Sequence, residues 1–307
     1  MNNKCYICYK DNFTDNLIYH PKCSKRVFGS ETAPEMPYRL DEMKKLARKI
    51  VQSQSVITGV QPKISMGIEK ANKQLGKLSL MSGDYILKPP SDTYNQLPEN
   101  EDLTMSLAAM AGIETVPHAL IPLKSGELAY ITKRVDRSVN GKIHMEDFCQ
   151  LSGLATAEKY KSSLERVGRT MATFSSNFGL DLFNLFALIL FCFISGNNDM
   201  HLKNFSLIKK DKWVMAPGYD LLNVTLALPT DIEETALTIV GRKRKLTKEN
   251  FLALGESYRL STKQIDNSLS MICEPDYHGL IQRSFLNADN KKQYSELIDM
   301  RRGILMP

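Results

Sequence analysis

The sequence lacks an uninterrupted apolar stretch long enough to cross a membrane. Its longest apolar run, Leu185–Ile194, is about half of the roughly 20 residues that a membrane-spanning helix needs. The first residues, MNNKCYICYKDNF, also lack a charged segment followed by an apolar stretch, which is the pattern of a secretory signal peptide. We therefore expect a cytoplasmic protein with no membrane partner, and we expect Leu185–Ile194 to form a buried helix.

Cysteine is scarce, and its placement argues against a disulfide framework. The sequence has six cysteines in 307 residues, and three of them stand singly in apolar or helical surroundings, as core thiols do: Cys149, Cys192 and Cys273. Lys and Arg number 40 against 34 Asp and Glu, which gives a net charge of +6. This excess suits an anionic ligand but is spread too evenly for a nucleic-acid-binding arm, so we expect no direct DNA binding.

Apolar sequence is abundant enough for a full core. Hydrophobic residues make up 43% of the chain and charged residues 24%, and the length allows two lobes or domains. Two prolines in SETAPEMPY mark a linker. We therefore divide the chain into a Cys-containing N-terminal segment, a β-rich N-lobe and a helical C-lobe, at residues 1–38, 39–135 and 136–307.

The hydrophobic period changes along the chain from that of strands to that of helices. Alternating apolar residues with Gly and Pro punctuation predict a hairpin or meander in 56–70 and 76–90, and two more strands in 115–123 and 126–136. A helical period predicts a helix at Leu40–Val51 and another at 97–113, which has Leu103, Leu107 and Met110 on one face. Further helices are predicted at 156–178, 180–195, 247–256, 261–273 and 276–303. This order predicts an α+β fold with the two-lobe layout of protein kinases.

A polar segment, GNNDMHLKN, follows the apolar run directly. Four residues separate Asp199 from Asn204, as they separate the base from a metal ligand in a protein-kinase catalytic loop. The aspartate would accept a proton from the substrate hydroxyl, and the asparagine would hold Mg²⁺ against the phosphates. The alternative is an Asp199 that only caps a turn.

Two further charged positions fit the same chemistry. Asp220 follows an apparent strand, KWVMAPGYD, where a second metal-binding carboxylate is expected, although a turn aspartate is the alternative. Lys88 ends an apolar strand, and Glu101 begins the next helix. A strand lysine that neutralises the α and β phosphates and is held by a helix glutamate is the expected kinase pair, and a surface lysine is the alternative.

Seven blocks in order resemble the signature blocks of one family: VITGVQPKIS, YILKPP, PENEDLTMSLAAMAGI, TKRVDR, HMEDFCQLSG, GNNDMHLKNFSL and YDLLN. That family is the HipA family of bacterial serine/threonine kinase toxins, and the resemblance runs from about residue 53 to residue 225. The block GNNDMHLKNF and the short length look most like HipT, the compact kinase of three-part HipBST systems. The pair Glu146 and Asp147 belongs to a block of this family and is assigned no chemistry.

The resemblance implies roles for individual residues. Asp199 would be the catalytic base, and Asn204 and Asp220 the Mg²⁺ ligands. Lys88 would bind the α and β phosphates of ATP and Glu101 would orient it. Further nucleotide contacts would come from His201 and Lys203 at the phosphates, from the backbones of Lys133 and Val135 at the adenine, and from the loop residues Thr58, Gly59, Val60, Gln61 and Lys63. Thr58 is the best-placed autophosphorylation site, with Ser55 slightly upstream as the second candidate.

The function implied by the resemblance is that of the toxin of a type II toxin–antitoxin system. Such a protein is an ATP- and Mg²⁺-dependent serine/threonine kinase that phosphorylates itself and a translation component, here expected to be an aminoacyl-tRNA synthetase. Its partners would be a small HipS-like antitoxin that resembles the missing HipA N-terminal subdomain, and a DNA-binding HipB-like protein. The alternatives are a kinase of the same type with another target, and a nucleotide-binding scaffold without kinase activity.

The N-terminal segment adds a spacing of its own. Cys5, Cys8, His20 and Cys23 follow a C-x2-C-x11-H-x2-C pattern that is compatible with one tetrahedral zinc ion. Such an ion could staple a segment that is too short for its own core. The alternative is two buried cysteine pairs that pack on the kinase lobe. The basic stretch 241–248 is expected to be a solvated face, or a surface for an acidic protein or tRNA.

Overall fold

The computed structural model describes residues 4–11, 17–53, 62–71, 74–81, 83–138 and 140–307. The chain forms two compact units. The first consists of Met1–Leu103, Val116–Arg134 and Arg283–Leu286, and the second of Thr104–Thr115, Val135–Gln282 and Asn287–Pro307. Residues 4–38 thus share a unit with the residues that follow them, up to Leu103. The predicted residues Ser55, Thr58, Gly59, Val60 and Gln61 lie outside the described residues.

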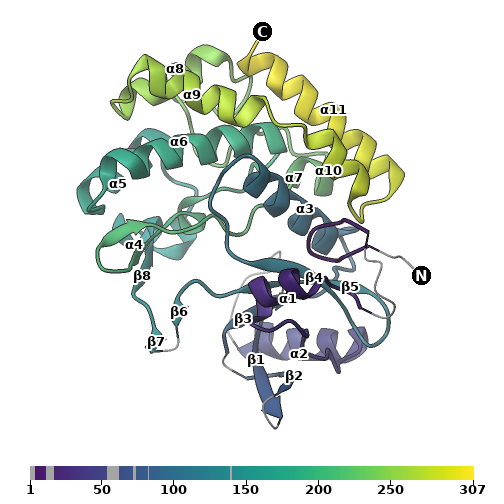
Figure 1. The fold of residues 1–307 in the computed structure, drawn as a ribbon. Helices are drawn as coiled ribbons and strands as arrows, with labels where there is room; N and C mark the ends of the chain where they lie inside the picture. The colour runs from purple at the N-terminus through teal and green to yellow at the C-terminus, as the bar shows by residue number, and fades with distance from the viewer. Residues whose placement is uncertain (1–3, 12–16, 54–61, 72–73, 82, 139) are drawn as a thin grey trace. The chain divides into compact units, whose positions relative to one another are not determined.

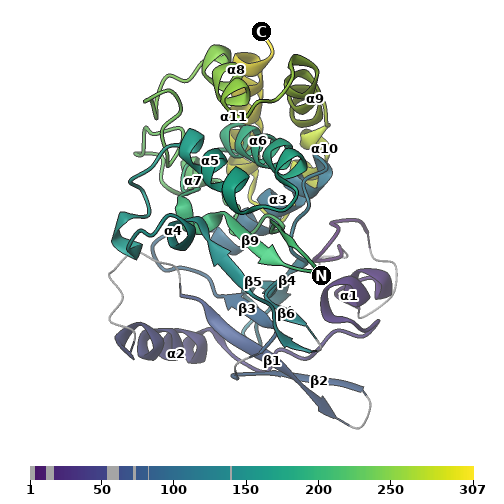
Figure 2. The same cartoon turned by 90° about the vertical axis from the view of Figure 1, so that its left-hand side faces the viewer.

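The first unit is built on an antiparallel sheet of five strands in the order β2-β1-β3-β5-β4 (Figures 1 and 2). The strands are β1 (Ile64–Ala71), β2 (Gln74–Ser79), β3 (Tyr85–Lys88), β4 (His118–Pro122) and β5 (Leu128–Lys133). In β3, the side chains of Tyr85 and Leu87 are buried, as the alternating pattern requires of one face of a sheet. The predicted meander and the two later strands are therefore confirmed.

Two helices complete the core of the first unit. Helix α1 (Pro21–Phe28) contributes Val27 and Phe28, and helix α2 (Leu40–Ser53) contributes Met43, to the cluster that contains the inward residues of the sheet. The amphipathic pattern predicted α2 almost to its bounds. Helix α1 was not predicted, although it starts with proline at its first turn and ends at Gly29, which has a φ of 78°.

The second unit is organised around helix α6 (Phe178–Ser195), which is apolar on all sides. Helices α5 (Leu164–Phe174), α8 (Lys248–Ser257), α9 (Thr262–Cys273) and α11 (Ala288–Leu305) all contact it (Figure 1). By length and composition alone α6 could cross a membrane, but 72% of its residues are buried inside the protein. The predicted buried helix is confirmed, because a helix that is hydrophobic all round needs neighbours on every side.

Two of the predicted helices are wrong in extent. The segment 156–178 holds a 3-10 turn (Thr156–Glu158) and then α5, which starts where the Ser163 side chain accepts a hydrogen bond from the Arg166 N–H. The segment 276–303 is divided into α10 (Tyr277–Arg283) and α11, because Asn287 caps the start of α11 in the same way. In both cases a capping side chain begins a new helix.

Short elements complete the second unit. A three-stranded sheet has the order β10-β9-β8, formed by β8 (Met145–Asp147), β9 (Ser206–Lys209) and β10 (Trp213–Met215). Further elements are the two-stranded pair β6 (Arg137–Ser138) and β7 (Gly141–Lys142), helices α4 (Phe148–Leu151) and α7 (Val224–Ala227), and a 3-10 turn (Leu202–Asn204). Of the three expected core thiols, Cys149 and Cys192 are buried, whereas Cys273 is half-buried.

Helix α3 (Leu97–Met110) starts in the first unit and continues into the second after Leu103. Leu103 and Leu107 are buried, as predicted from their shared face. Met110, predicted on the same face, is 40% exposed. It is the last residue of the helix.

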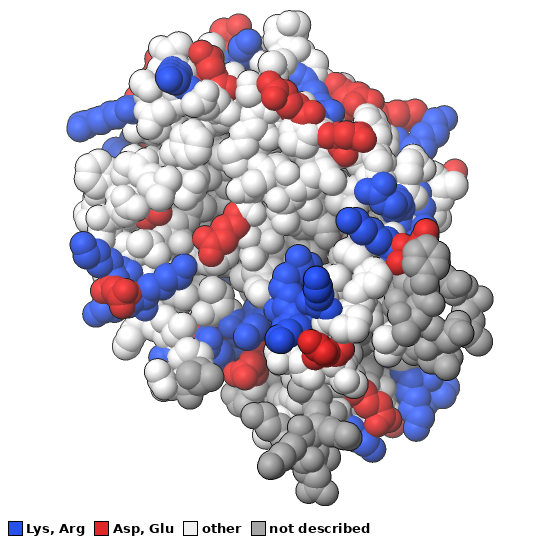
Figure 3. Space-filling view, viewed as in Figure 1, with Lys and Arg blue, Asp and Glu red and all other residues white. Residues whose placement is uncertain are grey.

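Charged side chains of both signs are interspersed over the face drawn in Figure 3, around wide uncharged areas. Several of the described pairs are solvent-exposed, such as Lys292 with Glu296 at 3.9 Å. Exposed pairs of this kind contribute little to stability, so the fold depends on its cores instead.

The end of α6 requires a glycine. Gly196 has a φ of 76°, and its N–H closes the helix by bonding to the carbonyls of Cys192 and Phe193. Its own carbonyl accepts the N–H groups of Val224 and Thr225 at 2.9 and 3.2 Å. A Cβ at this position would lie 2.6 Å from Asn223 Oδ1 and 2.6 Å from a methyl group of Leu297. The turn out of α6 therefore needs both a left-handed backbone and the absence of a side chain.

The substitution Gly196→Ala should be more destabilising than Gly241→Ala. Gly241 has a similar φ of 73°, but a Cβ there would meet nothing within 4 Å. The left-handed backbone costs alanine about 1–2 kcal/mol at either position. Crowding against Asn223 and Leu297 should add roughly 1–3 kcal/mol at Gly196 alone. Urea denaturation of the two variants measures the difference, and equal losses would show that the contacts at Gly196 relax without cost.

Candidate active site

Lys88 and Glu101 form a buried ion pair in the first unit. Lys88 is the last residue of β3, and its Nζ lies 2.5 Å from Oε1 of Glu101 in α3. Their side chains are 5% and 2% exposed. The lysine ammonium also lies 5.5 Å from the ring centroid of Tyr130. Removing two charges from water is costly, so such a pair is rarely retained for stability alone.

In the second unit, the polar segment after Gly196 is fixed by hydrogen bonds that its own asparagines make. Asn198 Nδ2 donates to Asp231 Oδ2 at 3.0 Å and to the Glu233 carbonyl at 2.8 Å. Asn204 Nδ2 donates to the backbone carbonyl of Asp199 at 3.0 Å. The structure therefore places Asp199 and Asn204 together on one short loop, with the loop anchored at Asn198.

The Asp199 carboxylate has one hydrogen-bond partner in the described part of the chain. Tyr160 donates its hydroxyl to Asp199 Oδ1 at 2.6 Å. Burial raises the pKa of Tyr160, and the hydrogen bond to the carboxylate raises it further, so the tyrosine stays a donor. The interaction fixes one carboxylate oxygen of Asp199 and leaves the other outside this hydrogen bond. This arrangement fits a general base better than a turn cap, because the side chain does not bond to its own loop.

His201 is buried beside Asp199. Its ring packs edge-on against Tyr160 with centroids 5.0 Å apart, and its Nδ1 has no hydrogen-bond partner among the described residues. Burial lowers the pKa of His201, and this effect outweighs the charges of Asp199 and Asp220, which raise it.

Lys203 is held by a carboxylate that the sequence pattern left without a role. Its Nζ lies 2.6 Å from Asp147 Oδ2. The other oxygen of Asp147 accepts the Gln150 N–H and caps helix α4. Asp147 therefore fixes the lysine from β8, at the edge of the three-stranded sheet.

Asp220 occupies a strained backbone position. Its φ is 60°, in the left-handed region that aspartate tolerates better than most side chains. The preceding Tyr219 anchors the turn, because its hydroxyl contacts Ser206 Oγ at 2.5 Å and donates to the Lys203 carbonyl at 3.1 Å. The strained turn is thereby attached to the end of the loop that carries Asn204. Strain of this kind is concentrated at functional sites.

The other predicted nucleotide contacts are less well defined. Lys63 is exposed, just before β1. The N–H of Lys133 donates to the Pro117 carbonyl at 2.8 Å, so a contact with adenine through that N–H would have to displace this bond. Val135 is half-buried and belongs to the second unit, whereas Lys133 belongs to the first.

Tyr160 and Asp147 were not found from the sequence. Tyr160 lies 39 positions from Asp199 and Asp147 lies 56 positions from Lys203. No spacing rule connects residues so far apart, and only the fold brings them together.

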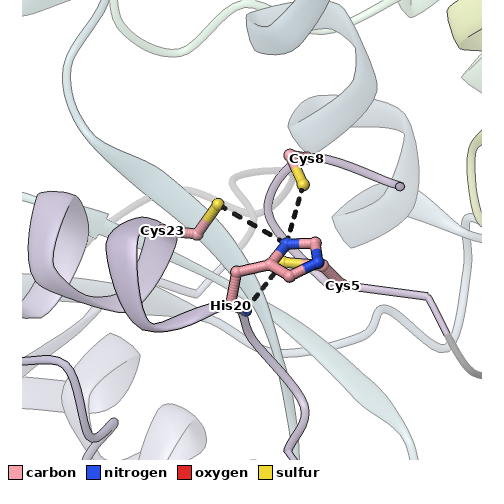
Figure 4. A group of neighbouring side chains, drawn as sticks. All are labelled: Cys5, Cys8, His20 and Cys23. Atoms are coloured by element: carbon pink, nitrogen blue, oxygen red, sulfur yellow. Dashed lines mark hydrogen bonds between the residues drawn. The ribbon is translucent and has the colours of Figure 1, made fainter. Parts of the chain in front are cut away.

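The Cys5, Cys8, His20 and Cys23 side chains lie together in the first unit (Figure 4). Their potential ligand atoms all lie within 4.8 Å of one another. The predicted alternative of two separate cysteine pairs does not describe this arrangement.

Comparison with known proteins gives the family. Residues 55–275 match the model of the HipA-like C-terminal domain. A Sinorhizobium fredii protein named "Putative kinase Y4dM" is 33% identical over 68% of this chain and 55% of its own length. A Haemophilus influenzae protein named "Putative kinase" is 29% identical over 62% of this chain and 59% of its own length. The chain spans a little over half the length of these two curated relatives.

Solved structures share the fold. HipA of Shewanella oneidensis, in a structure with HipB and operator DNA, has a TM-score of 0.68 at 19% identity, over 88% of this chain and 70% of its own. The Helicobacter pylori proinflammatory kinase CtkA has a TM-score of 0.54 at 17% identity, over 78% of this chain and 93% of its own. The predicted α+β, kinase-like fold is therefore confirmed.

The family match and the shared fold together assign the chain to a family. It has the fold of HipA and CtkA, and it belongs to the family of the HipA-like C-terminal domain.

Breaking the buried pair should destabilise the protein far more than breaking an exposed pair on the same sheet. Lys88→Met leaves the Glu101 carboxylate buried without its cation, which should cost about 3–5 kcal/mol. The matched control is Lys77→Met in β2, whose 3.7 Å pair with Glu35 is 61% exposed on both sides and should cost under about 1 kcal/mol.

The double variant Lys88→Met with Glu101→Met tests whether the lost stability comes from the unpaired buried charge. It removes both charges and should recover much of the stability lost in the single variant. Thermal unfolding of the four proteins measures these differences. Equal melting temperatures for Lys88→Met and Lys77→Met would show that breaking the Lys88–Glu101 pair costs no more stability than breaking an exposed pair.

Proposed function

We propose that this chain is an ATP-dependent protein kinase that transfers the γ-phosphate of ATP to serine or threonine hydroxyls, its own included. The observation that carries the proposal is the geometry of the loop Gly196–Asn204. Tyr160 holds the Asp199 carboxylate from outside the loop, and the Asn204 side chain bonds to the Asp199 backbone carbonyl. The family match, the kinase names of the relatives and the fold of CtkA support the same activity. Asp199 accepts the proton of the attacking hydroxyl, since its carboxylate is fixed without being paired to a cation in the described residues.

The residues that would hold Mg²⁺ and ATP are those with suitable donor atoms. Asn204 and Asp220 offer amide and carboxylate oxygens, which are the ligands that Mg²⁺ prefers. When bound, Mg²⁺ neutralises phosphate charge. Lys88, oriented by Glu101, contacts the α and β phosphates, and His201 and Lys203 contribute donors near Asp199. A buried ion pair retained despite its desolvation cost is consistent with this role.

Residues before β1 would add further contacts to the nucleotide. Thr58, Gly59, Val60, Gln61 and Lys63 would cover it, with Gly59 allowing close backbone approach and Lys63 adding positive charge. The backbones of Lys133 and Val135 would contact the adenine. Phosphorylation of Thr58, or of Ser55, would place about −1.5 to −2 charge beside the phosphates of ATP. The modified loop would then repel the nucleotide and inactivate the kinase.

A structural relative supports a proposed biological setting. HipA in the Shewanella oneidensis structure belongs to a toxin–antitoxin system together with HipB and operator DNA. We assign this chain the corresponding role of a cytoplasmic HipT-like toxin whose partners are a HipB-like protein and a small HipS-like antitoxin. Its target is a translation component, an aminoacyl-tRNA synthetase.

Replacing Asp199 by Asn should abolish phosphate transfer and leave the fold intact. The asparagine oxygen still accepts the Tyr160 hydroxyl, but it no longer takes a proton, so the rate should fall by roughly 10²-fold or more. The assay follows γ-³²P from ATP into the chain itself and into a panel of purified aminoacyl-tRNA synthetases. The matched control, Asp211→Asn, lies in the exposed turn between β9 and β10 and should keep the wild-type rate.

Two results would contradict the proposal in different ways. Wild-type protein that binds ATP but labels neither itself nor any other protein would be a nucleotide-binding scaffold. Labelling of itself or of other proteins, but of no synthetase, would keep the kinase and remove the synthetase as its target.

Asp220→Asn should weaken the Mg²⁺ dependence of ATP binding. Asparagine tolerates the left-handed backbone at this position, so the change removes a charge without adding strain. Loss of even indirect metal partners lowers metal affinity about 10–100-fold, so loss of a ligand should cost at least as much. Calorimetric titration of ATP with and without Mg²⁺ measures the effect, with the exposed Asp266→Asn in α9 as control. An unchanged Mg²⁺ dependence would remove Asp220 from the ligand set.

A further inference from the structure

The Cys/His cluster of the first unit has the composition and geometry of a closed metal site (Figure 4). Cys5 and Cys8 come from the turn at the start of the chain, and His20 and Cys23 from the start of α1. Nδ1 of His20 lies 3.3 Å from Cys8 Sγ and 3.9 Å from Cys23 Sγ. The backbone N–H of His20 donates to Cys5 Sγ at 3.4 Å.

The histidine presents the correct nitrogen to the sulfurs. Nε2 of His20 lies 3.0 Å from the backbone carbonyl of Asp11. A carbonyl only accepts, so Nε2 carries the proton and the lone pair of Nδ1 points at Cys8 and Cys23. A metal-bound histidine is held in this way, because its second ring nitrogen donates to a carbonyl or carboxylate.

The spacing of the ligand atoms suits a tetrahedral ion. With metal–sulfur bonds of about 2.3 Å and metal–nitrogen bonds of about 2.0–2.1 Å, sulfur and nitrogen ligands stand about 3.5 Å apart. The two distances at His20 Nδ1 lie on either side of this value. Hydrogen bonding to the histidine alone explains the cluster less well, because the single lone pair of Nδ1 accepts one proton, whereas the sulfurs of both Cys8 and Cys23 face it. A cation satisfies all four groups at once.

We propose that Cys5, Cys8, His20 and Cys23 bind one zinc ion. All four positions are taken by protein side chains, so the site is structural and leaves no open position for a substrate. It goes beyond the proposed kinase activity and does not depend on it.

The ion would hold the N-terminal segment on the sheet of the first unit. Cys5 and Tyr19 are buried in the same core as the strands. The Tyr19 hydroxyl donates to the Leu120 carbonyl at 2.7 Å, and the Leu120 N–H donates to the Tyr6 carbonyl at 3.1 Å. Of the described residues 4–11 and 17–38, only Pro21–Phe28 form a helix, so these contacts would depend on the fixed turn that carries Cys5 and Cys8.

The same turn reaches the residue next to Glu101. Tyr9, one residue after Cys8, has a φ of 59° and donates its hydroxyl to Asp102 Oδ2 at 2.5 Å. His118 Nδ1 lies 2.8 Å from the other oxygen of Asp102. The zinc site therefore fixes the conformation of a buried network that adjoins the Lys88–Glu101 pair.

Metal analysis of untagged protein by mass spectrometry tests the proposal directly. We expect about one zinc per chain in the wild type and almost none in Cys8→Ser. The matched control is Cys273→Ser, a half-buried cysteine of the second unit that lies outside the cluster and should keep its zinc. Replacement of zinc by Co²⁺ should add the thiolate-to-cobalt absorption and the visible bands of a tetrahedral site.

If Cys8→Ser does not fold, the wild-type protein still tests the proposal. A thiol-modifying reagent should release one zinc per chain as it consumes the cluster thiols, and a strong chelator should lower the melting temperature. Three results would overturn the proposal. They are wild-type protein that lacks zinc and binds no added zinc, a disulfide among the three cysteines, or stoichiometric binding of another metal in place of zinc.

Discussion

The end of helix α6 is the constraint on which the larger unit depends. An apolar helix whose C-terminal end is buried leaves its last carbonyl groups without partners, and each must be satisfied inside the protein. Gly196 closes the helix in a left-handed turn, and Arg301 donates to the Phe193 carbonyl at 2.5 Å while its guanidinium lies over the Phe193 ring. The chain then leaves the core through asparagines that bond to neighbouring backbone and carboxylate groups. The same polar loop that completes the helix carries Asp199 and Asn204.

This arrangement explains why polar residues follow the most apolar run in the sequence. The buried helix is rigid, so the loop that follows it starts from a fixed point. Asn198 anchors its middle and Asn204 folds its end back onto Asp199. Preorganised groups of this kind need little rearrangement during a reaction, which is the usual source of electrostatic catalysis. In the proposed kinase, the buried Lys88–Glu101 pair of the other unit would apply the same principle, because a lysine already held in place would lose little entropy on binding a phosphate.

Much of the fold could be predicted from the sequence, because periodicity is local. The strands of the first unit, helix α2 and helix α6 follow directly from the spacing of apolar residues. The breaks at Ser163 and Asn287 did not, because either residue is as compatible with a helix surface as with a cap until its side chain finds a backbone N–H. Likewise the roles of Tyr160 and Asp147 depend on contacts across distant parts of the chain. For Cys5, Cys8, His20 and Cys23 the spacing suggested a site, and only the converging side chains distinguished one cluster from two pairs.

We propose that the loop after α6 supports transfer of phosphate to protein hydroxyls. The most direct measurement is the intact mass of the purified wild-type chain after incubation with saturating ATP and Mg²⁺, followed by assignment of the modified residues. The account predicts a mass increase of one or more phosphoryl groups, on serine or threonine and dependent on Mg²⁺. An unchanged mass, in protein shown by calorimetry to bind ATP and Mg²⁺, would contradict it.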